Sequence, residues 1–316
     1  MVNYCHKILL CMVFGCGATT NHSCVLCPSG ALKGNRINTD TVISTGLRDQ
    51  PLPRAMGNLQ VASAVGASGS CLKELTQAGS LKMLFPRVAN QMDLMGVSIN
   101  TAGGIAGGDR FSIAGRAGAS SRLTITTQAA ERIYRAKGSE IGRLSTELTV
   151  EAGARLDWLP QETILYDGAA LCRKLRINMA ADASFLAVEP LVFGRITMGE
   201  RLNQLSFKDN IHLMRGDDLV FADAIRLVGD AAGDLASPFS TNKAGAMASV
   251  VYVAPDADLF LPRIRDLLRP TGGASLIRKG VLFARLMATD SYILRQSLIP
   301  ILTLLRGSDL PKTWTL

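Results

Sequence analysis

The sequence predicts a mainly β protein whose strands stack in layers, as in a β-solenoid, with two or so helices towards the C-terminus. Strand-sized runs rich in Val, Ile, Leu and Thr follow one another from about residue 92. Turn-forming residues recur between these runs, at Gly118, Gly153 and Asp182, with separations of 35 and 29 residues. That spacing leaves room for two or three strands per repeat, which favours stacked layers over a sandwich.

The expected strands share a pattern in which apolar residues alternate with Thr, Ser or charged residues. Leu123 and Ile125 alternate with Thr and Arg, and Leu144, Leu148 and Val150 belong to a second Thr-rich run. Alternation with a period of two is typical of a strand with one buried face. The first two strands are therefore expected at 121–128 and 141–150, and the others at 171–179, 184–194, 203–214, 218–229 and 246–254.

Two helices are expected after residue 255. The stretch 256–269 has an acid-rich start, and Pro270 ends it. In 290–307, Asp290 is a suitable N-cap, Gly307 a suitable C-terminal residue, and Pro300 should kink the middle. The second half of this helix is apolar almost all round, so it needs cover from its own core or from another protein.

Residues 1–82 differ from the rest of the chain. They contain only two aromatic residues and no sustained helical or strand periodicity. We expect a disordered or non-essential extension here, followed by a single β-rich domain at 83–316. Met56 and Met83 are the candidate translation starts in this interpretation.

Cysteine usage and hydropathy bear on the compartment. Six of the seven cysteines lie within the first 71 residues, so the body keeps only Cys172, which fits a reducing compartment. The lone Cys24-x-x-Cys27 pair lacks a second pair for a zinc site. The apolar run Ile8–Phe14 is too short to span a bilayer. We expect a soluble, cytoplasmic protein without a membrane partner.

The net charge of +8 first suggests nucleic acid as a partner. Residues 1–82 carry seven basic and three acidic groups, and the other 234 residues carry 27 basic and 23 acidic groups. The excess is thus spread along the chain, and no Lys/Arg cluster is interleaved with aromatic residues. The sequence therefore predicts no nucleic-acid partner.

The stretch 100-NTAGGIAGGDRF-111 contains four glycines. In phosphate-binding loops a helix follows the glycines and directs its N–H groups at the anion. Here strand-like residues follow, and no Lys-Ser/Thr pair closes the loop, which argues against a nucleotide site. We expect a turn in which the glycines let layers approach and Asp109-Arg110 brace the corner.

The inventory of catalytic groups is small. His212 is the only histidine after residue 82, and no nucleophile-plus-base motif is present. A carbohydrate-active β-solenoid enzyme remains an alternative, because Asp109, Glu162 and Asp167 could supply its two carboxylates. Few aromatic residues are available to stack on a sugar, at 5% of the chain. We expect no enzyme activity.

Four motifs in the same order resemble the urease accessory protein UreD (UreH) family. They are the glycine stretch 103–109, 126-TTQAA-130 with 134-YR-135, 158-WLPQETI-164 with 167-DGA-169, and 194-GR-195 with 199-GE-200. The tail 306-RGSDLPKTW-314 is also similar, and the resemblance covers about residues 90–316. The motif residues that carry it are Gly103, Gly104, Gly107, Gly108, Arg110, Thr127, Gln128, Tyr134, Trp158, Pro160, Gln161 and Gly168.

The resemblance implies a scaffold without catalytic activity of its own. Members of this family are expected to bind the accessory proteins UreF and UreG, to dock onto apo-urease, and to form a dimer of heterodimers. Nickel passes to the urease active site while UreG hydrolyses GTP. The resemblance also implies a water-filled passage for the ion through a mostly β body, so nickel is expected in transit and no cofactor is tightly bound.

Two sets of site residues follow from this resemblance. Oxygen ligands that release the ion suit nickel transit, so some of the acids in or near the motifs are expected to line the passage. Alternatively, these acids brace turns against Arg110, Arg195 and Arg201. The C-terminal helix and tail are expected to bind UreF, with core burial as the alternative. The acids are Asp109, Glu162, Asp167 and Glu200; the partner-binding residues are Leu298, Ile301, Leu305, Arg306 and Trp314. An interaction module without a metal role is the minimal alternative.

Overall fold

The computed structural model describes residues 53–87, 92–195 and 198–315, and all of its helices and strands lie in the unit Arg54–Leu316. The elements in chain order are β1 (Met56–Gly66), β2 (Gly69–Gly79), β3 (Leu81–Leu84), β4 (Leu94–Asn100), β5 (Arg110–Ala117), β6 (Arg122–Thr127), β7 (Glu131–Ile133), β8 (Gly142–Val150), β9 (Arg155–Leu159), β10 (Thr163–Leu165), β11 (Ala170–Met179), β12 (Ser184–Phe193), β13 (Leu205–Arg215), β14 (Asp218–Gly229), α1 (Ala231–Ala236), β15 (Ala246–Val253), α2 (Ala257–Leu267), β16 (Gly273–Arg278), β17 (Val281–Ala288), α3 (Ser291–Arg306) and the 3-10 turn η2 (Lys312–Trp314).

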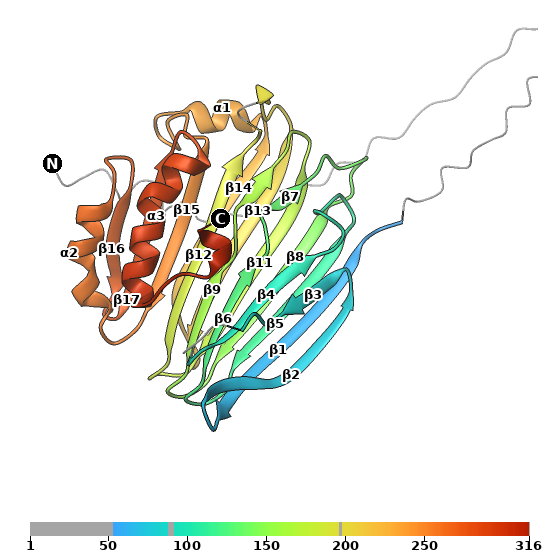
Figure 1. The fold of residues 1–316 in the computed structure, drawn as a ribbon. Coiled ribbons are helices and arrows are strands. Elements are labelled where there is room, and N and C mark those ends of the chain that lie inside the picture. Colours follow the sequence, from blue (N-terminus) through green and yellow to red (C-terminus); the bar gives the residue numbers. More distant parts are fainter. Residues whose placement is uncertain (1–52, 88–91, 196–197, 316) are drawn as a thin grey trace, which may run out of the picture. The chain divides into compact units, whose positions relative to one another are not determined.

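The strands form two stacked sheets (Figure 1). The seven-stranded sheet has the order β14-β13-β11-β8-β5-β1-β2, and the ten-stranded sheet has the order β16-β17-β15-β12-β9-β6-β4-β3, with β10 and β7 beside it. The inner strands of both sheets pair in parallel. The chain places β5, β8 and β11 in one sheet and β6, β9 and β12 in the other, so each circuit adds one strand to each layer.

The turns between the sheets stack on one another. The amide of Ser120 donates to the carbonyl of Ala152 at 2.9 Å, and the amide of Ser184 donates to that of Ala154 at 2.9 Å. Gly153 has φ of +64°, which glycine adopts at little cost. The predicted repeat with turns at Gly118, Gly153 and Asp182 is therefore present, and the prediction of layered, solenoid-like sheets is confirmed.

A core fills the space between the sheets. On β5, Phe111 and Ile113 are buried while Ser112 and Arg116 are exposed, as the pleat of a half-buried strand requires. The central strands β12 and β15 are buried along almost their whole length. They have this double cover because the seven-stranded sheet packs on one face of the ten-stranded sheet and the helices pack on the other (Figure 1).

The two C-terminal helices agree with the sequence prediction. The carboxylate of Asp290 accepts a hydrogen bond from the amide of Ile293 at 2.8 Å, and Gly307 has φ of +71°. These contacts satisfy backbone groups at the two ends of α3. The six-residue helix α1 was not predicted, because it is too short to show helical periodicity.

The predicted extension reaches too far into the chain. β1, β2 and the first half of β3 lie within residues 56–82, so that part belongs to the β body. Its pattern was missed for two physical reasons. A bulge between Ala62 and Ser63 interrupts the alternation of β1, and β2 is an edge strand with no buried residue. The cysteine pair and the apolar run of residues 1–52 lie outside the described residues.

No helix within the described ranges has the length and apolar character that crossing a membrane requires.

Candidate functional site

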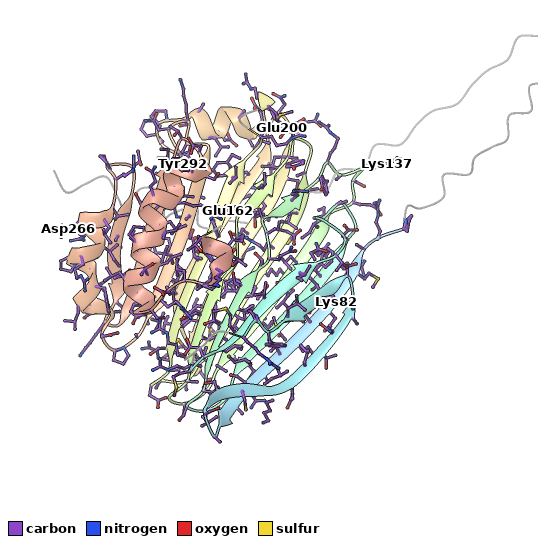
Figure 2. The ribbon with its side chains drawn as sticks, viewed as in Figure 1. Lys82, Lys137, Glu162, Glu200, Asp266 and Tyr292 are labelled. Atoms are coloured by element: carbon purple, nitrogen blue, oxygen red, sulfur yellow. The ribbon has the colours of Figure 1, made fainter. Side chains whose placement is uncertain are left out.

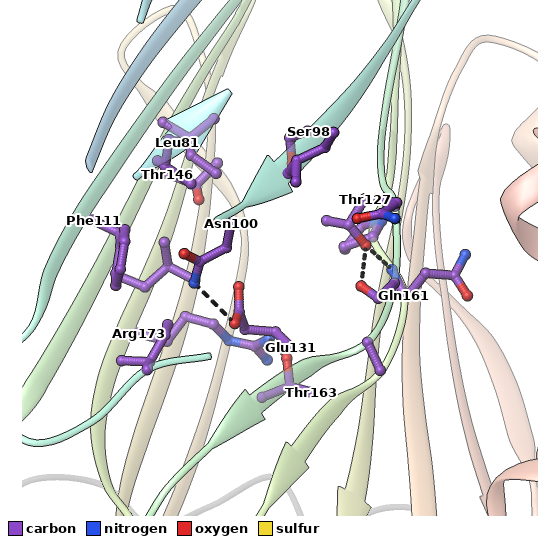
Figure 3. Close-up of a pocket in the computed structure, with 18 of the residues that line it drawn as sticks. Leu81, Ser98, Asn100, Phe111, Thr127, Glu131, Thr146, Gln161, Thr163 and Arg173 are labelled. Atoms are coloured by element: carbon purple, nitrogen blue, oxygen red, sulfur yellow. Dashed lines mark hydrogen bonds between the residues drawn. The ribbon is translucent and has the colours of Figure 1, made fainter. Parts of the chain in front are cut away.

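A cavity of about 180 Å³ lies between the two sheets; we call it the inter-sheet cavity. Apolar side chains such as Phe111 and Leu175 form part of its wall, and polar side chains converge from both layers (Figure 3). It is partly open, and exposed Gly103, Gln128 and Ala129 lie among its lining residues. The polar lining residues are Ser98, Asn100, Thr127, Gln128, Glu131, Arg132, Thr146, Gln161, Thr163, Arg173 and Glu189.

Glu131, the first residue of β7, is the carboxylate on the more open side of this cavity. The amide of Asn100 donates to its Oε1 at 3.1 Å, and the two side chains face each other (Figure 3). Burial raises the pKa of Glu131 to about 7, and the hydrogen bond from Asn100 only partly opposes this rise. The group can therefore gain or lose a proton near neutral pH.

A buried ion cluster forms the deep wall of the cavity. Arg173 of β11 contacts Glu189 of β12 and Asp209 of β13, each at 2.6 Å. Trp158 donates to Glu189 at 2.7 Å, and Arg173 donates to Thr163 at 3.0 Å. Because Arg173 and Glu189 belong to different sheets, the cluster joins the two layers.

The buried cluster contains one more carboxyl group than guanidinium groups. One guanidinium faces two carboxylates, all of them buried. Burial raises the pKa of Glu189, and the nearby charge of Asp209 adds to the rise, while Arg173 opposes it. The deep end of the cavity is therefore attractive to a cation or a proton.

The glycine loop lies against the stretch that carries Glu131. A Cβ on Gly104 would lie 2.4 Å from the Tyr134 ring, and one on Gly107 would lie 2.5 Å from the carbonyl of Glu140. Gly103 and Gly108 have positive φ angles of 77° and 87°. The loop thus depends on glycine both for close approach and for backbone conformation.

Asp109 braces that loop through backbone groups. It accepts hydrogen bonds from the amides of Ala55 at 2.8 Å and Ala106 at 2.7 Å. Arg110 lies exposed on the outer face of β5 and makes no ion pair within the described part of the chain. Only one half of the expected Asp109-Arg110 brace is therefore formed.

Glu162 fastens the C-terminal helix to the ten-stranded sheet. Its carboxylate pairs with Arg295 of α3 at 2.6 and 2.9 Å, and the same guanidinium contacts Gln161. Arg295 also lies over the ring of Trp314, 5.2 Å from its centroid. This predicted nickel contact is thus occupied by an ion pair.

Asp167 and Glu200 are the only two of the four predicted acids that lie together. Asp167 accepts from the amide of Gln204 at 2.9 Å and pairs with Arg135, and these contacts lower its pKa. Glu200 pairs with Arg195 at 2.9 Å, which lowers its pKa, and accepts from the amide of Asp167 at 3.3 Å. Arg201 makes no ion pair among residues the structure describes.

None of the four predicted acids lines the inter-sheet cavity. Within the described ranges no group of three His, Cys, Asp or Glu residues could hold a metal ion. Paired glycosidase carboxylates would face one cavity, whereas Asp109, Glu162 and Asp167 all lie outside the lining of the inter-sheet cavity. Glu131 and Glu189 were not predicted as site residues. Glu131 lies between the two parts of a quoted motif, 126-TTQAA-130 and 134-YR-135, whereas Glu189 lies in an apolar run that gave no signal.

The remaining motif residues hold the cavity walls in place. The hydroxyl of Thr127 accepts from the amide of Gln161 at 2.8 Å, and Tyr134 donates to the carbonyl of Gly103 at 3.1 Å. Gln128 and Pro160 line the cavity. Gly168 has φ of +77°, and a Cβ there would lie 2.7 Å from the Arg135 side chain.

The predicted partner-binding residues lie in the core. Leu298, Ile301, Leu305 and Trp314 are at most 1% exposed, and Arg306 is 8% exposed. They contact the ten-stranded sheet, so they form no accessible partner surface. The apolar second half of α3 is covered by its own chain. Large apolar side chains are exposed instead at Leu259 of α2, with 75% exposure, and at Tyr292 of α3, with 71%. Figure 2 labels Tyr292 on the outer side of α3.

Comparison with known proteins gives one consistent result. The model of the UreD urease accessory protein family matches residues 55–315. The chain is 48% identical to urease accessory protein UreD of Ruegeria pomeroyi over 258 residues, which cover 82% of this chain and all of the relative. It is 47% identical to the UreD of Roseobacter denitrificans over 264 residues, covering 84% and 96%. It is also 40% identical to the UreD of Mesorhizobium japonicum over 281 residues, covering 88% and 100%.

Proposed function

Because this chain belongs to the UreD urease accessory protein family, we propose that it is a non-catalytic scaffold that binds the urease apoprotein together with UreF and UreG. It works in the cytoplasm and helps to deliver nickel to the urease active site. The free cysteines Cys71 and Cys172 are compatible with a reducing compartment. Nickel is its cargo and not a resident cofactor.

The inter-sheet cavity is the proposed route of the ion. The observation that supports this route is the position of the Glu131 carboxylate in the cavity lining. A passing cation needs oxygen donors that bind weakly and let go, which a single carboxylate with hydroxyl and amide neighbours provides. Glu189, which shares Arg173 with Asp209, places a second carboxyl group deeper between the layers. No tight cluster is required for transit.

The four acids selected from the sequence act on structure in this proposal. Asp109 holds the glycine loop, Glu162 holds α3, and Asp167 with Glu200 holds the loops beside Arg135 and Arg195. Their carboxylates already accept hydrogen bonds from amides or guanidinium groups. Nickel would have to break these contacts to bind there.

UreF binds the outer side of the helix layer in this proposal. The support is the exposure of Leu259 and Tyr292, two large apolar side chains on adjacent helices. α2 and α3 pack against each other and against the ten-stranded sheet, which makes this side a rigid surface. The role expected for the C-terminal helix is thus moved from its buried face to its exposed face.

The proposed function is tested by nickel counting. Urease is produced with UreF, UreG and nickel, with or without this chain, and the metal content per active site is measured together with activity. The proposal expects far less nickel when the chain is omitted. Equal nickel content would contradict a role in delivery, and co-purification with urease at equal nickel content would point to an interaction module without a metal role.

A further inference from the structure

The outer face of the seven-stranded sheet carries an uneven charge. Along β5, β8, β11, β13 and β14, every second residue points away from the core and is exposed or half-buried. The long helices α2 and α3 contact the other sheet (Figure 1). This face is therefore open to a partner in the part of the chain that the structure describes.

Four cations lie in one row across this face. Arg110 of β5 is the register partner of Arg143 of β8, and Lys208 of β13 is the register partner of Arg226 of β14. Cys172 of β11 lies between the two pairs. Adjacent strands are about 4.8 Å apart, so the row extends over about 19 Å.

Two further cations on β11 widen the row into a patch. Lys174 and Arg176 are exposed on the same side of the sheet as Cys172. Glu147, the register partner of Arg176, is an exposed carboxylate beside them. We call the six cations the basic face: Arg110, Arg143, Lys174, Arg176, Lys208 and Arg226. None of them makes an ion pair within residues 53–87, 92–195 and 198–315.

Such a row has a physical cost for the isolated protein. Like charges directly opposite on neighbouring strands repel, by a few tenths of a kcal/mol to about 1 kcal/mol per pair. Here both register pairs, Arg110 with Arg143 and Lys208 with Arg226, consist of two cations. The arrangement lowers stability without a compensating contact, so an acidic partner is the simplest reason to have it.

Several candidate partners do not fit the positive charge of the basic face. The chain's own residues 1–53 carry Lys7, Lys33, Arg36 and Arg48 against Asp40 and Asp49, a net positive charge. A second copy would bring an identical basic face. Single-stranded nucleic acid binds platforms with stacking aromatic side chains, and the outward positions of these five strands contain no Phe, Tyr or Trp.

We propose that the basic face docks onto an acidic surface of the urease apoprotein. This inference rests on the scaffold role proposed above, and it assigns the client to the sheet side of the molecule. A scaffold that joins two proteins needs two separate surfaces, and the helix layer with Leu259 and Tyr292 lies on the other side of the ten-stranded sheet. The hydrogen-bonded sheet offers a preformed surface to a folded protein, with electrostatic attraction that speeds encounter and fixes orientation.

The test reverses the charge of two side chains in the row. The full-length chain is co-expressed with tagged urease apoprotein, the complexes are captured, and the NaCl concentration that releases half of the chain is measured. The double variant R143E/K208E is compared with R263E/K279E, which makes the same charge change at exposed positions on α2 and after β16. We expect half-release at about half the wild-type salt concentration for the first variant and no change for the second.

The unfolding midpoint of R143E/K208E distinguishes the loss of a docking contact from damage to the fold. R143E places a carboxylate beside Arg110, and K208E places one beside Arg226, so both repulsive pairs become attractive. The unfolding midpoint of R143E/K208E should therefore rise by about 2–4 °C while binding weakens. A fall in the midpoint, with binding lost in parallel, would overturn the inference.

The remaining outcomes of the experiment also test the inference. If wild type and R143E/K208E are released at the same salt concentration, the basic face is not the docking surface, although wild-type capture leaves the scaffold role standing. If wild type is not captured at all, both proposals fail. If nuclease treatment abolishes capture, or a 20-base-pair duplex binds the basic face more tightly than the apoprotein, the occupant is nucleic acid and the inference is wrong.

Discussion

At the scale of single residues, Glu131 is the group that links the chemistry of the cavity to solvent. Its carboxyl is half-buried, its pKa lies near 7, and Asn100 is its hydrogen-bond partner. A group poised in this way is a weak cation ligand that protons can compete for. We therefore expect nickel passage to be slower at pH 6 than at pH 8.

The raised pKa of Glu131 makes a stability prediction with a definite sign. Its folded-state pKa of about 7 lies above the ordinary value of 4.5, so the stabilisation from keeping it protonated is full at low pH and is lost as pH rises through 7. E131Q removes the buried charge. The variant should match wild type near pH 4.5 and exceed it by up to about 3 kcal/mol above pH 7.

Urea unfolding of the two proteins at a series of pH values measures this difference. E74Q, at an exposed position on the edge strand β2, is the matched control and should follow wild type throughout. A constant difference between E131Q and wild type from pH 5 to 8 would mean that Glu131 is not held in its protonated form.

At the scale of elements, the ion pair of Arg295 with Glu162 helps to fasten α3 to the ten-stranded sheet, together with the pair of Arg306 with Asp157. Arg295 is 23% exposed and Glu162 is 8% exposed, so removing the guanidinium leaves a buried carboxylate without its partner. We expect R295A to lower the free energy of unfolding by about 3 kcal/mol. The double variant R295A/E162Q should recover most of this loss, because no unpaired charge remains.

Denaturant midpoints of the two variants and wild type measure the effect. Equal losses in R295A and R295A/E162Q would show that packing of Arg295 on Trp314, and not the ion pair, holds the helix.

The helix layer gives a second prediction at this scale. L259D and Y292D each place a charge on the exposed side of α2 or α3, where no core contact is lost. Co-purification with UreF should fall by at least about tenfold, because an apolar interface excludes an unpaired carboxylate. The matched control is T271D, an exposed loop position between α2 and β16.

The unfolding midpoint of the first two variants should stay within about 1 °C of wild type, because surface substitutions change stability little. Undiminished capture of UreF by both variants would move the UreF surface away from the helices.

At the scale of the whole molecule, the sequence predicted the features that depend on residues close together in the chain. The repeat of Gly118, Gly153 and Asp182 and the caps Asp290 and Gly307 are local signals, so the layered fold and both long helices could be predicted. The edge strand β2 could not be predicted, because a strand without buried residues has no alternation of apolar and polar side chains.

The candidate site depends on neighbours that the sequence does not reveal. Glu131, Arg173 and Glu189 come from β7, β11 and β12, and the cavity exists only because two sheets stack. The cation row runs across the strands, so its members are far apart in the chain: 33 residues separate Arg110 from Arg143, 65 separate Arg143 from Lys208, and 18 separate Lys208 from Arg226. An even charge along the chain was therefore compatible with a basic face in space.

Glu131 in the inter-sheet cavity is the carboxylate that we propose passes nickel to urease. The most direct test measures nickel per urease active site after activation with wild type, E131Q or the control E74Q, alongside the amount of assembled complex. We expect normal assembly with all three proteins and nickel loading reduced at least about fivefold with E131Q alone. Because E131Q is expected to be the more stable protein at neutral pH, unfolding would not explain such a loss. Full nickel loading by E131Q would contradict the claim.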